Sequence, residues 1–70
     1  MSTALKLNTH DLVMLHIILE ARATDLAAFI KDTDYGAKHP TPAQAEAVFR
    51  ADTNYLADIR AVQAKINAAI

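Results

Sequence analysis

Residues 36–44, Gly-Ala-Lys-His-Pro-Thr-Pro-Ala-Gln, decide the fold because they separate two long segments with periodic apolar residues. Gly36 is the only glycine, and we expect it to end the first helix in the left-handed conformation that glycine adopts without a steric clash. Thr41 is placed to cap a second helix, Pro42 occupies its first position, and Gln44 completes a capping box. This stretch therefore predicts that the chain folds back on itself as an antiparallel helical hairpin.

The segments on either side of the turn, which spans about residues 34–41, have the apolar spacing of amphipathic helices. We expect the first helix at about residues 9–33, capped by Asn8 or Thr9, and the second at about residues 42–69. The stripes that should meet in the seam are Leu12, Leu15, Leu19, Ala23, Leu26 and Ile30 in the first helix, and Ala45, Val48, Phe49, Asp52, Tyr55, Leu56, Ile59, Val62 and Ile66 in the second. The predicted fold class is all-α, with one two-helix antiparallel hairpin.

Two charged residues interrupt the predicted seam. A turn near residue 38 places Leu19 beside Leu56, and it places Arg22 and Asp52 at a common level. We expect a structural ion pair between these two, since either charge alone in the seam would carry an uncompensated desolvation cost. The alternative is that both side chains leave the edges of the stripes and reach solvent.

The first helix has more apolar surface than one partner helix covers. The face opposite the seam carries apolar residues near the chain ends and becomes polar beyond residue 22. Such an asymmetry is typical of an interface. We expect self-association as a homodimer, most simply an antiparallel four-helix bundle, through Val13, Met14, Ile17, Ile18, Ala21, Ile66 and Ile70.

Length and composition limit the classes of function. A chain of 70 residues, treated as one domain over residues 1–70, buries little surface and has no cysteine for disulfides or thiolate metal sites. Its net charge of −1 argues against a nucleic-acid partner, and its longest apolar run is too short to span a membrane. No signal peptide is recognised, so we expect a cytoplasmic protein, of a bacterium or of the host cell if virus-encoded.

No group of residues predicts catalysis, and no residue is assigned to a catalytic, cofactor or metal site. His16 and Glu20 are four residues apart and share a helix face, but two ligands do not make a metal site. The alternative hypothesis is a ligand-binding or metal-binding bundle, in which these two line a polar centre of the dimer with Arg22, Asp52 and Tyr55.

The turn has two interpretations. Tyr35, Lys38 and His39 could form an exposed recognition tip, because loops often carry binding residues. Alternatively, the Tyr35 ring packs onto Ala45 or Phe49 as a staple and keeps its hydroxyl in water.

These patterns favour a non-enzymatic protein–protein interaction module of the adaptor, accessory, co-chaperone or inhibitor type. Its warrant is surplus apolar surface without convergent polar groups. The expected partners are a second copy of the chain and another protein, which the sequence does not identify. A DNA-binding regulator is disfavoured, because no basic face or recognition helix can be drawn.

Overall fold

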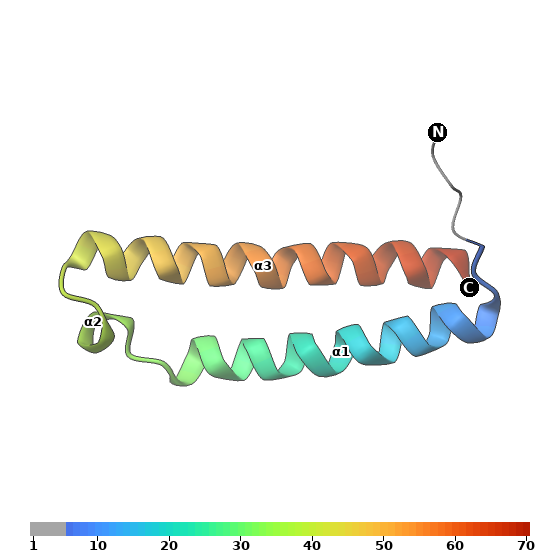
Figure 1. Ribbon diagram of the computed structural model, residues 1–70, viewed down its shortest axis with the longest axis horizontal. Coiled ribbons are helices and arrows are strands. Elements are labelled where there is room, and N and C mark those ends of the chain that lie inside the picture. The colour runs from blue at the N-terminus through green and yellow to red at the C-terminus, as the bar shows by residue number, and fades with distance from the viewer. Residues whose placement is uncertain (1–5) are drawn as a thin grey trace.

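The computed structural model describes residues 6–70, and this part of the chain forms an all-α helical hairpin. Helix α1 spans Thr9–Asp32, the short helix α2 spans Tyr35–Lys38, and α3 spans Pro42–Ala69. In Figure 1, α1 and α3 lie side by side and antiparallel, and α2 lies under the first turns of α3. We call the end with α2 the turn end. The opposite end, where α1 begins and α3 finishes, is the open end.

Polar caps start both long helices. Asn8 and Asp11 form a reciprocal capping box at α1, in which the Asn8 side chain accepts from the Asp11 N–H at 2.8 Å. Thr41 accepts from the Gln44 N–H at 3.2 Å, with Pro42 in the first turn of α3. The predicted start of α3 is therefore confirmed, although Gln44 does not return the bond among the side-chain hydrogen bonds of the described residues.

Gly36 does not end a helix, and that expectation is wrong. Helix α1 already ends at Asp32, and its cap Thr33 is extended while its N–H donates to the Phe29 carbonyl at 2.9 Å. The Asp34 side chain then accepts from the Ala37 N–H at 3.1 Å and starts α2, with Gly36 inside that helix. No glycine in the described residues has a positive φ. A side-chain cap, rather than a left-handed glycine, therefore redirects the chain.

The hydrophobic core occupies only part of the predicted seam. Ala23, Leu26 and Ile59 are buried, and the half-buried residues packed against them are Leu19, Ile30 and Leu56. Other members of the predicted stripes remain exposed by more than a third, namely Leu15, Val48, Phe49, Tyr55 and Val62. Two helices touch along a line, so residues on either side of that line stay in contact with solvent.

The helices are shifted along each other relative to our expectation. Glu20 reaches Arg60 and Gln63, which lie four and seven residues beyond Leu56, the residue expected beside Leu19. The shift is about one to two helical turns. Its cause is the linker: α2 occupies the space opposite the first turns of α3, so α1 meets α3 further toward its C-terminus.

The hairpin is a single layer of helices. The structure measures 46 Å along its longest axis and 15 Å along its shortest, whereas one helix with side chains is about 11 Å thick. Domains are normally built from two packed layers, and this chain supplies one.

Candidate interaction surface

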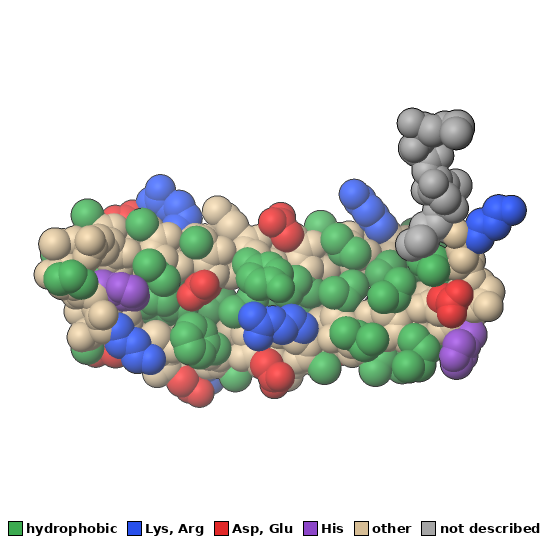
Figure 2. Space-filling view, in the orientation of Figure 1, with side chains coloured by type: hydrophobic (Ala, Val, Ile, Leu, Met, Phe, Trp, Pro, Cys, Tyr) green, Lys and Arg blue, Asp and Glu red, His purple; other side chains and the backbone are tan. Residues whose placement is uncertain are grey.

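An apolar patch lies on α1 at the open end. Its large members Val13, Met14, Ile17 and Ile18 are 38%, 46%, 57% and 57% exposed, and Ala21 is exposed beside them. Ile70 is 54% exposed and Ile66 half-buried. Figure 2 shows apolar side chains along the whole length of this view, the half at the open end included. We call the five α1 residues the open-end patch.

The patch exists because α3 covers only one side of α1. The large patch residues lie on the face of α1 opposite the seam residues, so they point away from α3: Val13, Met14, Ile17 and Ile18. Beyond residue 22 the same side of α1 is polar and exposed, with Thr24, Asp25, Lys31 and Asp32. On this face of α1, the apolar surplus is thus confined to the half of the helix near the open end.

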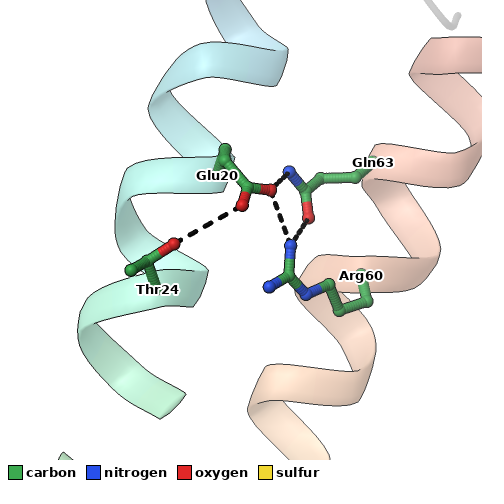
Figure 3. A network of polar contacts seen from close by, with 4 residues as sticks. All are labelled: Glu20, Thr24, Arg60 and Gln63. Carbon is green, nitrogen blue, oxygen red and sulfur yellow. Dashed lines mark hydrogen bonds and ion pairs between the residues drawn. The ribbon is translucent and has the colours of Figure 1, made fainter. Parts of the chain in front are cut away.

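A polar network joins the two long helices (Figure 3). Glu20 Oε2 accepts from Arg60 Nη1 at 2.6 Å and from Gln63 Nε2 at 2.8 Å, while Arg60 Nη1 also donates to Gln63 Oε1 at 2.9 Å. Thr24 Oγ1 donates to the other Glu20 oxygen at 3.4 Å. The hydrogen bonds from Gln63 and Arg60 hold the pKa of Glu20 below its ordinary value of 4.5.

This network was not predicted, because Glu20 was considered with His16 and the other residues of the alternative polar centre. Gln63 is only 5% exposed, whereas its neighbour Val62, which was expected in the seam, is 45% exposed. Its amide is satisfied from both sides, by Arg60 on its own helix and by Glu20 across the seam. The signal available was the spacing of Arg60 and Gln63, three residues apart on one face of α3.

Arg22 and Asp52 do not form the predicted ion pair. Asp52 Oδ2 instead accepts from the Tyr35 hydroxyl at 2.8 Å, and the Arg22 guanidinium lies 5.5 Å from the centre of the Tyr55 ring. Both side chains do line one hollow of about 340 Å³, together with Asp25, Leu26, Phe29 and Tyr55. Each group has a different partner, namely a hydroxyl for the acid and an aromatic face for the base, so the two charges are not buried as a pair.

The turn is closed by a staple rather than displayed as a tip. Tyr35 is only 9% exposed, and its ring packs edge-on against Phe29 and Phe49, with centroids 6.5 and 5.3 Å away. Its hydroxyl is not left in water, because it donates to Asp52. Burial and the neighbouring Asp52 carboxylate raise the pKa of Tyr35 to about 12.

The other two residues of the expected recognition tip, Lys38 and His39, also contact aromatic rings. Lys38 is exposed, but its Nζ lies 5.7 Å from the centre of the Phe29 ring. His39 is half-buried and stacks on Tyr35 at 6.5 Å. These three residues therefore form a packed cluster at the turn end, and Tyr35 is not available as an exposed contact.

The residues of the alternative polar centre do not come together. Glu20 belongs to the network with Arg60, Asp52 is held by Tyr35, and Arg22 lies on Tyr55. Within residues 6–70, no three His, Cys, Asp or Glu side chains are grouped so that they could hold a metal ion. Within one hairpin, these residues therefore belong to separate contacts and form no common site.

Over the described part of the chain, no helix combines the length and apolar character needed to cross a membrane. Comparison of the chain with protein-family models, with curated proteins and with solved structures found no match.

Proposed function

We propose that this protein is a non-enzymatic interaction module that self-associates through its open end. The observation that carries the proposal is the exposure of Ile17 and Ile18, each 57% open on a helix with no cover on that side. Burying one such side chain fully stabilises a complex by about 1.5 to 3 kcal/mol. A second copy recovers this free energy twice, once for each chain.

The amount of exposed surface supports a dimer. The large apolar side chains of the open-end patch stay 38% to 57% exposed, and a second copy would remove them from water. Two single layers stacked on each other would give the usual two-layer arrangement, a dimeric four-helix bundle. The proposed dimer therefore supplies the second layer that the single hairpin lacks.

As a dimer, the protein would act as an adaptor or accessory subunit that presents paired helical surfaces to another protein. The polar groups at the centre of the hairpin are used in holding the helices together, as in the network of Glu20, Arg60 and Gln63. This arrangement supports a role in binding rather than in chemical conversion of a substrate.

The experiment compares two double variants that add the same charge. Ile17→Asp/Ile18→Asp places carboxylates in the patch, and Ala57→Asp/Ala61→Asp places them at exposed positions of α3. The unfolding midpoint of a dimer rises with protein concentration, whereas that of a monomer does not. We expect this concentration dependence for the wild type and the α3 variant, and its loss in the patch variant. A wild-type midpoint that is independent of concentration from 1 to about 500 μM would contradict the proposal.

A further inference from the structure

The two sides of the helical layer differ in character. One side carries the network of Glu20 and Arg60 (Figure 3). The other carries the Arg22 guanidinium over the Tyr55 ring. Ile18 and Leu15 lie four and seven residues before Arg22, so they share its side of α1. The apolar surface of the open end therefore continues from the patch onto this second side of the layer.

On this side, four residues of α1 form one stripe with spacings of four, three and four: Asp11, Leu15, Ile18 and Arg22. Leu15 and Ile18, in the middle, are 38% and 57% exposed. A carboxylate stands at one end and a guanidinium at the other. Among the described residues, Arg22 makes no hydrogen bond or ion pair, and Asp11 accepts through Oδ2 from the Asn8 N–H alone. The charges at both ends of the stripe are thus able to accept new partners.

We propose that the partner on this surface is a second copy of the chain, with its α1 lying antiparallel across the stripe. A twofold axis between Leu15 and Ile18 places Leu15 opposite Ile18 of the second copy. The same axis places Asp11 opposite Arg22 of the second copy, and this pair occurs twice. This inference rests on the proposed function and adds to it the side of the layer, the axis and the orientation.

Charge selects the antiparallel orientation. A parallel pairing would set Asp11 against Asp11 and Arg22 against Arg22, and like charges across an interface are repulsive. The antiparallel pairing converts both contacts to attraction, and it also aligns the two helix dipoles favourably. Because the stripe reads the same from either end with the charges exchanged, it is self-complementary. No other protein is required to account for its pattern.

The orientation has a consequence for shape. The axis lies near the open end, so the two hairpins overlap over that half and their turn ends point in opposite directions. With a hairpin 46 Å long, the dimer would be about 65 Å long, whereas a parallel stack would keep the length of one hairpin. Small-angle scattering on the wild-type dimer distinguishes these two lengths.

Charge reversal tests the pairing directly. Asp11→Lys and Arg22→Glu each make both end contacts of the homodimer repulsive, and each should raise the dimer Kd by about tenfold at low salt. An equimolar mixture of the two variants restores attraction at both ends, so it should dimerise about as well as the wild type. The matched controls Asp32→Lys and Lys31→Glu change the net charge equally at exposed positions outside the stripe. They should leave Kd within about twofold.

A second comparison does not involve the charges or the helix cap that Asp11 forms. Ile17 and Ile18 are neighbours with the same exposure, but Ile17 lies three residues before Glu20 and leans toward the other side of α1. Ile18→Asp should therefore weaken the dimer at least about tenfold more than Ile17→Asp. Circular dichroism confirms that each variant stays helical.

The outcomes separate the two proposals. Rescue in the mixture together with the larger effect at Ile18 supports the antiparallel stripe. A wild-type dimer whose Kd responds no more to Asp11→Lys and Arg22→Glu than to the controls, or responds more to Ile17→Asp, overturns the stripe and leaves the proposed function standing. A wild type that is monomeric at all concentrations overturns both.

Discussion

The turn end and the open end of the hairpin are built from the same two helices, yet among the described residues only the turn end has a third helix packed against them. At the turn end, α2 adds a third element, and Tyr35 is buried between Phe29 and Phe49. At the open end no third element is present among the described residues, and Ile17 and Ile18 stay more than half exposed. The third helix buries Tyr35, although Phe29 and Phe49 beside it stay 49% and 43% exposed. The open end lacks such a cover within the described chain, and we infer that another molecule supplies it.

Similar truncations in the core and at the open end should have very different effects, and this is the largest difference that we predict. Leu26→Ala removes a buried side chain from a core of few residues, which typically costs about 2 to 5 kcal/mol. Because a chain of this size is marginally stable, we expect Leu26→Ala to be largely unfolded at 25 °C by circular dichroism. Ile18→Ala should keep its helicity and lose only association. Equal loss of helicity in both variants would contradict the distinction.

The next largest effect concerns the staple. Tyr35→Phe keeps the ring packing but removes the hydroxyl that donates to Asp52, so the unfolding midpoint should fall by about 5 °C. The folded-state pKa of about 12 exceeds the ordinary value of 10.0, so the wild type should lose stability as pH rises from 10 through 12. Tyr35→Phe should lose less over that range. Thermal unfolding at pH 8, 10 and 11 measures both effects, and identical midpoints for the two proteins would contradict the role of the hydroxyl.

Gly36 offers a smaller change of the opposite sign. A Cβ added there would meet only Asp34 Oδ1 at 3.5 Å, which is ordinary contact, and the backbone has no positive φ. Gly36→Ala should therefore stabilise the protein by about 0.4 to 1 kcal/mol, because alanine restricts the unfolded chain. Chemical denaturation gives this value from the shift in midpoint. A destabilised variant would instead support the left-handed turn that the sequence first indicated.

The smallest effect is expected at the seam network, since its ion pair is half-exposed to solvent. Glu20→Gln should lower the unfolding midpoint by about 2 °C at pH 7. Folding lowers the pKa of Glu20, so its contribution is complete above about pH 5 and is lost as pH falls through the lowered pKa. The gap between wild type and variant should close on acidification. A gap that widens at low pH would contradict the network.

The sequence was sufficient to predict the hairpin because its local signals are strong. Thr41 and Pro42 start α3 as expected, and the apolar spacing identified Leu26 and Ile59 as seam residues. The path of the turn was not predictable from Gly36, because α1 ends before this glycine and the Asp34 side chain caps the short helix α2 that contains it. Because α2 lies in the linker, the residues that face each other across the seam differ from the pairs that we expected.

The candidate surface was predictable only in part. The exposure of Ile17 and Ile18 followed from helical periodicity alone. Leu15 was assigned to the seam, and its exposure became visible only when the true register placed the core at Ala23 and Ile59. The partners of Arg22 and Asp52 depend on the same register. Counting residues from the middle of the linker predicts that register only to within one or two helical turns.

The central claim is that the open end of this single-layer hairpin is covered by a second copy of the chain. Sedimentation equilibrium of the wild-type protein at micromolar concentration tests it most directly. The account predicts a species with twice the chain mass of 7.6 kDa that dissociates on dilution. A folded, helical species that keeps the mass of one chain up to about 500 μM would contradict it.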